Sequence, residues 1–192
     1  MLGTLPLGGE ELQKLYDTMT NKKLSLEKGS LKNINYTENY LQFLHKDFQE
    51  NYGNSSLKVA WDPGNGATGP TLQKLLPQLP GTHFLINELV EVTYPTRASD
   101  PTIFENLKQL SQVVQNKECD FGVAFDGDGD RLSVIDKYGR LLLADQLLPL
   151  LAEEVLKTHP GTSILIDIKS SIHLLNSIKK LGGKPLLCFC GH

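Results

Sequence analysis

The sequence predicts an α/β fold, because from Leu57 onward short apolar runs alternate with amphipathic helical patterns. Two further observations support this class. A turn rich in glycine and proline follows one apolar run, and a cluster of aspartates follows another. In open α/β sheets, ligands bind at loops beyond the carboxyl ends of the strands. We therefore expect helices packed on a sheet, with a candidate site at one edge of it.

The first predicted unit contains a strand at 57–62, a turn-rich loop at 63–70, a helix at 71–79, a strand at 83–89, a helix at 100–118 and a strand at 119–126. The helix at 100–118 has the clearest pattern. Asp100 is its predicted N-cap and Pro101 its first helical residue. Its apolar stripe consists of Ile103, Leu107, Leu110, Val113 and Val114.

The segment 132–143 reads as a strand, a turn at Tyr138-Gly139 and a second short strand. A new unit follows, with Asp145 as the predicted cap of a helix that continues to about Lys157. It continues with a strand at 163–169, a helix at 170–183 and a strand at 184–189. Before the first unit, the sequence predicts a helix around Glu10–Met19, a polar linker, and a helix at 37–48 that packs onto that unit.

Composition and charge exclude several classes. The 192 residues carry a net charge of −3, so no basic field favours nucleic acid or an anionic membrane. Cys119, Cys188 and Cys190 include no CxxC pair and favour neither a disulfide framework nor a zinc site. The N-terminus lacks a basic flank and a long apolar run, and no segment approaches 18 consecutive apolar residues. We expect a soluble cytoplasmic protein.

The stretch FDGDGDR at 125–131 places Asp126, Asp128 and Asp130 at alternate positions directly after a buried strand. Two carboxylates about 5 Å apart repel by roughly 3 kcal/mol at an effective dielectric of about 20, so a cation or solvent must neutralise them. The intervening glycines permit the curvature that turns all three carboxylates toward one point. Oxygen-only ligands suit Mg²⁺ shared with a phosphate, and Arg131 is placed to bind that phosphate.

Other interpretations of this stretch stay open. It could be a solvated acidic turn that binds nothing. An EF-hand is excluded, because position 6 would be Arg131 instead of glycine and position 12 would be Lys137 instead of glutamate. An aspartyl-phosphate phosphatase also presents DxDG after an apolar strand, with Asp126 as nucleophile, although Asp130 at the next position weakens that match. A non-catalytic module that binds metal or a phosphosugar is a further alternative.

Several motifs together resemble the α-D-phosphohexomutases, the phosphomannomutase and phosphoglucomutase enzymes. VAFDGDGDRLSVID resembles their metal loop, and VAWDPGNGATGP resembles the turn that opens their second domain. DPTIFENLKQL, ADQLLPLLA, DIKSS and the final GH resemble further segments of the second and third domains, and LPLGGEELQKL resembles the tail of the first. The resemblance implies a three-layer α/β/α domain with a mixed, largely parallel sheet, plus a partial second domain of the same type.

The resemblance also implies an activity. Family members interconvert hexose 1-phosphates and 6-phosphates through a phosphoserine and a bisphosphorylated sugar. It implies that Asp126, Asp128 and Asp130 bind Mg²⁺ together with a phosphoserine oxygen, and that Arg131 lies near the phosphoryl group. Lys169 and His192 match positions that touch substrate or assist proton transfer.

The sequence departs from the family pattern at the serine loop, the sugar loop of the third domain and the phosphate clamp of the fourth, none of which it contains. We therefore expect an internal fragment: residues 1–35 as a tail and linker, 36–140 as a complete α/β domain, and 141–192 as a truncated next domain. Such a fragment is expected to be inactive alone and to need a hexose phosphate and complementary mutase segments. An exposed sheet edge and apolar surface are expected near Leu186–Phe189, hence poor solubility or association.

Overall fold

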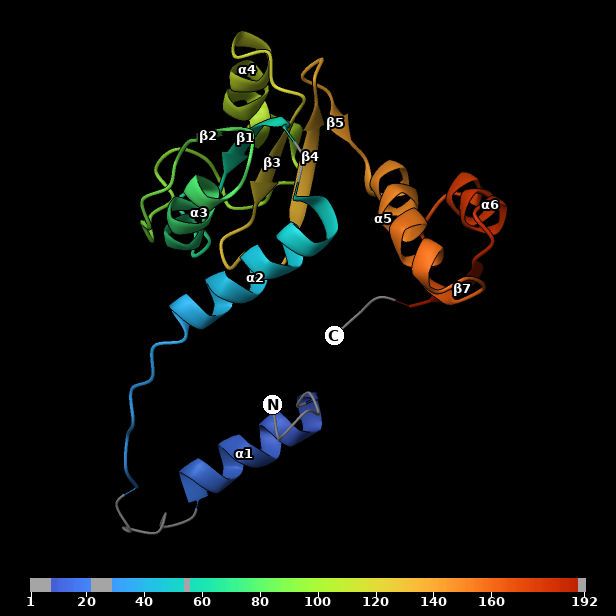
Figure 1. Ribbon diagram of the computed structural model, residues 1–192. Coiled ribbons are helices and arrows are strands. Elements are labelled where there is room, and N and C mark those ends of the chain that lie inside the picture. Colours follow the sequence, from blue (N-terminus) through green and yellow to red (C-terminus); the bar gives the residue numbers. More distant parts are fainter. Residues whose placement is uncertain (1–7, 22–28, 54–55, 190–192) are drawn as a thin grey trace. The chain divides into compact units, whose positions relative to one another are not determined.

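The computed structural model describes residues 8–21, 29–53 and 56–189 (Figure 1). By its internal contacts the chain divides into one compact unit of residues 35–188 and another of residues 1–34 with 189–192. Within the described residues, every helix is too short or too polar to cross a membrane.

The described part of the smaller unit contains helix α1 (Gly9–Asn21), which agrees with the helix predicted around Glu10–Met19. Its apolar side chains recur at helical spacing and are all exposed: Leu12, Leu15, Tyr16 and Met19. A helix with such a stripe gains most of its stability by packing that stripe against another surface.

A five-stranded mixed sheet forms the centre of the larger unit, in the order β2-β1-β3-β4-β5. Its strands are β1 (Lys58–Asp62), β2 (Thr82–Leu85), β3 (Phe121–Phe125), β4 (Leu132–Asp136) and β5 (Leu141–Leu142). The pairings of β1 with β2 and with β3 are parallel, whereas β3, β4 and β5 pair antiparallel. The carboxyl ends of β1 and β3 therefore lie side by side, and the acidic loop follows β3.

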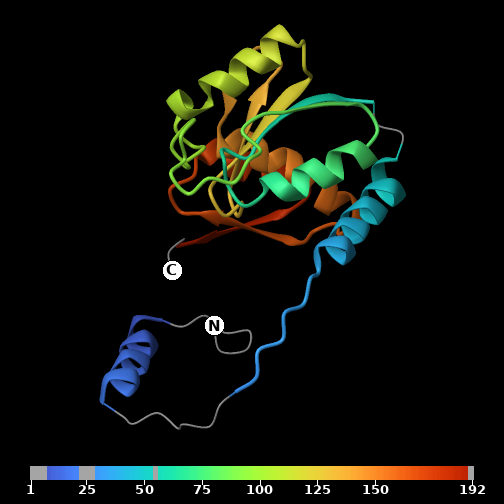
Figure 2. The same cartoon turned by 90° about the vertical axis from the view of Figure 1, so that its left-hand side faces the viewer.

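Helices cover both faces of this sheet (Figure 2). The chain leaves β1 through α3 (Gly69–Leu75) for one neighbour, β2, and later reaches the other neighbour, β3, through α4 (Lys108–Asn116). Right-handed crossovers in opposite directions along a sheet place their helices on opposite faces. Helix α2 (Thr37–Tyr52) packs on α3, where Lys74 and Glu38 form an ion pair of 3.3 Å. The predicted three-layer α/β/α arrangement with a mixed sheet is confirmed. The sheet is not largely parallel as expected, because two of its four strand pairings are antiparallel.

The core lies between α4 and the sheet. Leu107, Leu110, Val114, Ala60, Ala124 and Ile135 are completely buried there. Gly122 of β3 faces the same helix: a Cβ atom at this position would lie 2.6 Å from Val114 Cγ2. The absence of a side chain at Gly122 therefore lets α4 approach the strand that carries the acidic loop.

Two helix starts differ from their predictions. Helix α4 begins at Lys108, after a 3₁₀ turn at Phe104–Leu107, because Asp100 instead accepts hydrogen bonds from Thr102 N and Oγ1 at 2.9 and 2.8 Å. Such local bonds compete with helix formation, and Ile103, predicted in the stripe, is exposed. Helix α5 (Ala144–Thr158) begins before Asp145, which accepts a hydrogen bond from Ser171 N at 2.8 Å.

The strand predicted at 83–89 is also shorter than expected. β2 ends at Leu85, and Asn87 adopts a left-handed conformation with φ of 54°. That conformation interrupts an extended strand. It also directs the chain into the long connection 86–103, which returns over the carboxyl ends of β1 and β3, as hydrogen bonds from Arg97 to Asp62 and Phe125 show.

The remaining elements are α5, β6 (Ser163–Asp167), α6 (Ile172–Lys180) and β7 (Lys184–Cys188), with β6 and β7 paired in parallel. Their core consists of Ala152, Leu156, Ile166, Leu174 and Ile178. Ser171 caps α6, with its side chain accepting from Leu174 N at 3.3 Å. Leu165, Leu186, Leu187 and Phe189 are exposed, which confirms the predicted apolar surface near Leu186–Phe189.

Candidate metal centre

The acidic loop brings its three aspartates together, as their spacing predicted. Asp126, Asp128 and Asp130 each offer a carboxylate oxygen, and these oxygens lie within 4.8 Å of one another. Asp126 is buried, with 1% of its surface exposed, whereas Asp128 and Asp130 are exposed. The cluster therefore has one fixed member at its base and two members that open to solvent.

Hydrogen bonds hold Asp126 in place. Its Oδ1 accepts from the backbone N–H groups of Gly129 and Arg131 at 3.0 and 3.1 Å, and its Oδ2 accepts from Arg131 Nε at 2.6 Å. Gly129 has φ of 79°, a left-handed conformation that favours glycine. The loop thus curls back so that its own amides meet the carboxylate that begins it.

The electrostatics differ between the base and the rim of the cluster. Burial by itself would raise the pKa of Asp126, but hydrogen bonds from Arg131 and Gly129 outweigh it and leave that pKa below its ordinary value. At Asp130 the negative charge of Asp128 is the main cause that raises the pKa. A bound cation would relieve this repulsion, so the charges of the loop favour cation binding.

The donor set fits a hard divalent cation. All three side chains offer carboxylate oxygens, the ligands that Mg²⁺ prefers. A carboxylate has about four lone-pair sites, and Asp126 uses three of them for protein donors. One lone pair of Asp126 thus remains for a metal, next to the more accessible oxygens of Asp128 and Asp130.

The turn at 63–70 supports the acidic loop from the neighbouring strand end. Ala67 N donates to Gly127 O at 2.8 Å. A Cβ atom at Gly66 would lie 2.7 Å from the same carbonyl oxygen, and a Cβ at Gly129 would collide with Thr68 Cγ2. Glycines at both positions let the two loops lie in direct contact, so this turn has a structural use in holding the acidic loop.

The other predicted site residues lie elsewhere in the chain. Lys169 follows β6, where its Nζ lies 3.6 Å from Asp167 Oδ2 and its backbone N donates to Asp167 Oδ1 at 2.9 Å. His192 lies outside the described residues. Arg131, by contrast, lies within the cluster, and its side chain is 60% exposed while its Nε binds Asp126.

The sequence interpretation missed a buried ion pair beneath the loop. Arg97 Nε donates to Asp62 Oδ2 at 2.8 Å, and both side chains are almost completely buried. The one sequence signal was an aspartate that closes the apolar strand before Pro63-Gly64. No local sequence pattern predicts that Arg97 is its partner, because Arg97 lies 35 residues further along the chain in an irregular connection.

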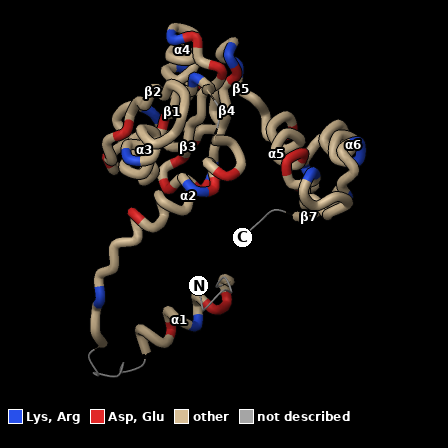
Figure 3. Tube along the Cα trace, viewed as in Figure 1, with Lys and Arg blue, Asp and Glu red and all other residues tan. Residues whose placement is uncertain are grey.

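Charged residues of both signs are interspersed along the described parts of the chain, as Figure 3 shows for the Cα trace. Several acidic residues outside the loop pair with nearby cations, such as Asp136 with Arg140 Nη2 at 2.7 Å and Glu154 with Lys157 Nζ at 2.7 Å. The acidic loop differs because three carboxylate oxygens lie within 4.8 Å of one another, while Arg131 pairs with two of the three aspartates, Asp126 and Asp130.

Comparisons with known proteins agree with this arrangement. Residues 36–139 match the family described as phosphoglucomutase/phosphomannomutase, alpha/beta/alpha domain II. The chain is 34% identical over 186 residues to a phosphomannomutase/phosphoglucomutase of Pseudomonas syringae pv. tomato, which covers 97% of this chain and 39% of that relative. It is 32% identical to a phosphoglucomutase of Neisseria meningitidis serogroup B, of which 42% is covered.

A solved structure gives the same result. A phosphoglucomutase/phosphomannomutase family protein from Burkholderia thailandensis superposes with a TM-score of 0.88 at 31% identity. The match covers 97% of this chain and 40% of that one. The chain thus spans about two fifths of the length of the relatives that it matches, at 39% and 42%.

Proposed function

Because the chain belongs to the phosphoglucomutase/phosphomannomutase family, we propose that it is part of a phosphohexomutase and supplies the divalent metal centre of that enzyme. The reaction would interconvert hexose 1-phosphates and 6-phosphates. One observation carries the proposal: three carboxylate oxygens within 4.8 Å of one another follow a central strand of the family's domain II.

In this proposal Asp126, Asp128 and Asp130 hold Mg²⁺. The metal would supply neutralisation of the charge on a phosphoryl group during its transfer. The buried Asp126, fixed by Arg131 and Gly129, would set the position of the ion. Asp128 and Asp130 would complete the site from the exposed side, which leaves room for a phosphate oxygen.

Arg131 would hold that phosphate. Its Nε donates to Asp126, and its side chain is 60% exposed, so the residue is accessible from solvent beside the cluster. A guanidinium binds phosphate oxygens with a fixed, planar geometry. We assign Lys169 and His192 to substrate contact or proton transfer, on the basis of their motifs in the sequence.

The chain alone is proposed to lack mutase activity. Its sequence contains no match to the family's serine loop, and it corresponds to 39% of the Pseudomonas syringae relative. Complementary segments that carry the phosphoserine would be needed as partners. Residues 36–140 would contribute a complete domain and residues 141–192 the start of the next.

A phosphatase with Asp126 as nucleophile fits the local geometry less well. Both oxygens of Asp126 accept hydrogen bonds from Arg131, and the side chain is buried. A nucleophilic carboxylate must direct a free lone pair at an approaching phosphorus atom, and the one lone pair that Asp126 retains is the one assigned to the metal. Release of phosphate from a simple phosphoester by the purified chain, lost in Asp126→Asn, would support the phosphatase instead.

Calorimetric titration with Mg²⁺ tests the metal centre directly. We expect wild type to bind Mg²⁺ and Asp128→Asn to bind it at least about tenfold more weakly, since even outer-shell changes cost 10- to 100-fold in metal affinity. The matched control Asp47→Asn replaces an exposed carboxylate on α2 and should bind as wild type does. Equal affinity in Asp128→Asn and wild type would refute the assignment.

Activity assays test the remaining part of the proposal. The purified chain should not convert mannose 1-phosphate or glucose 1-phosphate into the 6-phosphate. Turnover should appear only after complementary mutase segments that contain the serine loop are added. Turnover by the chain alone would contradict the proposed inactivity.

A further inference from the structure

Arg97 makes an unusually complete set of contacts for a loop residue. Its side chain is 4% exposed, and all three guanidinium nitrogens donate. Nε binds Asp62 Oδ2 at 2.8 Å and Nη1 binds Ala98 O at 3.0 Å. Nη2 binds the carbonyl oxygens of Asp62 and Phe125 at 3.2 and 2.7 Å.

These contacts join two strand ends. Asp62 is the last residue of β1, and Phe125 is the last residue of the adjacent parallel strand β3. The residue after β1 is Pro63, which has no backbone N–H and therefore cannot donate a hydrogen bond to the neighbouring strand. The guanidinium of Arg97 donates to carbonyl oxygens at both strand ends instead, and so holds the carboxyl ends of β1 and β3 together.

Both carboxylate oxygens of the partner, Asp62, also accept hydrogen bonds. Asp62 is completely buried, and its Oδ1 accepts from Gly64 N at 2.8 Å and from Asn87 Nδ2 at 3.0 Å. A buried charge is tolerated only when it is paired and hydrogen-bonded in this way. A Cβ atom at Gly64 would lie 2.9 Å from Arg97 Nε, so the glycine leaves space for the guanidinium.

The link to the acidic loop runs through one peptide bond. The Phe125 carbonyl that Arg97 binds belongs to the same planar peptide as the N–H of Asp126. That N–H donates to Arg131 O at 3.2 Å. Both polar atoms of the peptide are thus held, and this fixes the direction in which Asp126 leaves its strand.

We propose that Arg97, paired with Asp62, is a positioning residue that orients the Asp126 carboxylate for metal binding. The metal part of this inference depends on the proposed function. Lysine cannot replace Arg97 here, because one ammonium group cannot reach four acceptors that surround a planar fork. The hydrogen bond of Arg97 toward the loop is made to a backbone atom, the carbonyl oxygen of Phe125.

The chain contains a natural reporter for this position. Its single tryptophan, Trp61, stacks on Phe125 with ring centroids 6.5 Å apart and an interplanar angle of 8°. Trp61 Nε1 also donates to His83 Nδ1 at 3.1 Å, which anchors the indole on the sheet. Fluorescence excited at tryptophan therefore reports a displacement of Phe125 and of the loop that follows.

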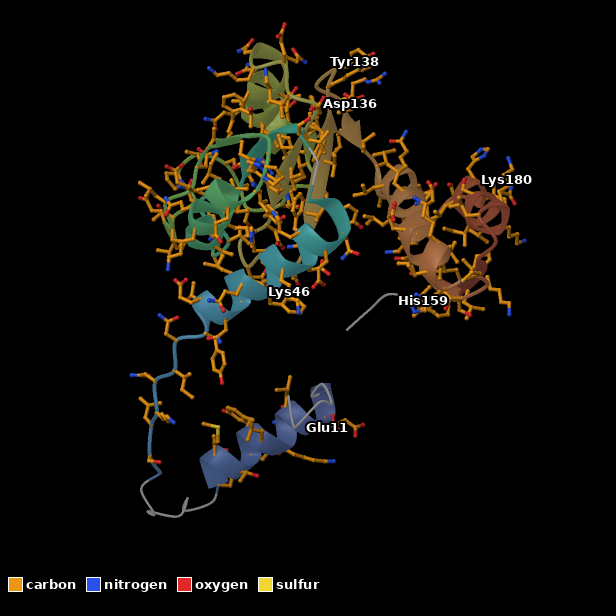
Figure 4. All side chains as sticks on the ribbon, in the orientation of Figure 1. Glu11, Lys46, Asp136, Tyr138, His159 and Lys180 are labelled. Carbon is orange, nitrogen blue, oxygen red and sulfur yellow. The ribbon has the colours of Figure 1, made fainter. Side chains whose placement is uncertain are left out.

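The experiment compares the full chain with Arg97→Lys and with a matched control, Arg140→Lys. Arg140 pairs with Asp136 at the turn between β4 and β5, at the end of β4 remote from the acidic loop. Figure 4 labels Asp136 and Tyr138 at this turn. Two quantities are measured: Mg²⁺ affinity, followed by Trp61 fluorescence and calorimetry, and hydrogen exchange at the amides of Gly129 and Arg131.

For Arg97→Lys we expect Mg²⁺ affinity about tenfold or more below wild type, within the range found for outer-shell partners of metal sites. The amides of Gly129 and Arg131 should exchange faster, while those of Val123 and Ile135 in the strands remain protected. Arg140→Lys should change none of these values. A purely structural role of Arg97 would instead loosen the strand amides together with those of the loop.

Unchanged loop exchange and unchanged affinity in a folded Arg97→Lys would overturn the positioning role. If wild type and Asp128→Asn fail alike to bind Mg²⁺, the proposed metal centre is wrong, and the exchange comparison still decides the role of Arg97. If Arg97→Lys does not fold, the double variant Asp62→Asn/Arg97→Gln removes both buried charges. Positioning then predicts fast loop exchange with protected strands, and slow loop exchange refutes it.

Discussion

The five-stranded region (residues 36–142) and the two-stranded region (residues 144–188) contain similar strand-helix units but bury their strands to different extents. In β3, the residues Gly122, Val123 and Ala124 are all buried between neighbouring strands and helices. In β6 and β7, Ile166 is the one fully buried strand residue, and Leu165, Leu186 and Leu187 are exposed.

The difference follows from the number of neighbours. A central strand such as β3 has a partner on each side, whereas β6 and β7 are each paired on one side within the described residues. Unpaired edges and uncovered faces leave apolar side chains in water. The candidate metal loop thus lies in the well-buried region, where a carboxylate can be held in a fixed position.

The largest expected effect is the loss of core packing. Leu110→Ala should lower the free energy of unfolding of the five-stranded region by about 3 kcal/mol, because the side chain is completely buried and leaves a cavity. Leu165→Ala in β6, where the side chain is 67% exposed, should change stability by less than about 0.5 kcal/mol. Urea unfolding measures both. Similar losses in the two variants would contradict the comparison.

The next effect is on self-association through the two-stranded region. Leu187→Lys should weaken association of the chain about tenfold, since burying one leucine contributes at least about 1.5 kcal/mol and 1.4 kcal/mol corresponds to tenfold. Sedimentation velocity over a range of concentrations gives the association constant.

Val92→Lys is the matched control for association, because Val92 is an exposed apolar residue in a loop of the five-stranded region. It should leave association unchanged. If Val92→Lys weakens association as much as Leu187→Lys does, the two-stranded region is not the surface that associates.

The smallest effect concerns Asp130, an exposed member of the acidic loop. The charge of Asp128 raises the pKa of Asp130, so ionised Asp130 destabilises the metal-free fold. Asp130→Asn should therefore slightly raise the thermal midpoint at pH 7. This advantage should vanish as the pH falls through the raised pKa of Asp130 toward its ordinary value of 3.8, because wild type then protonates there.

Asp126, in the same loop, has the opposite pKa shift and therefore the opposite effect on stability. Its pKa is lowered, so its contribution to stability is present above the unfolded value of 3.8 and is lost as the pH falls through the folded pKa. Asp126→Asn should consequently be less stable than wild type at pH 7. If Asp126→Asn and Asp130→Asn shift the thermal midpoint in the same direction, the electrostatic distinction between the buried Asp126 and the exposed Asp130 is wrong.

The sequence predicted the α/β class, the order of the main elements and the convergence of Asp126, Asp128 and Asp130. These features have local signals: apolar periodicity for strands and helices, and alternate aspartates with glycines for a tightly curved loop. The predictions failed where distant contacts replaced local ones. Asp145 has the residue type of an N-cap, yet its carboxylate accepts from Ser171, 26 positions away.

Residues close together in the chain decide which elements form and which loop carries the charges. The way in which that loop is held depends instead on contacts between distant parts of the chain. Arg97 reaches Asp62 and Phe125 across 35 and 28 positions, and the turn at 63–70 meets the acidic loop through glycines that leave space for its backbone. Such contacts form because two strand ends lie side by side at one edge of a sheet, and a short stretch of sequence does not predict which strand ends will be neighbours.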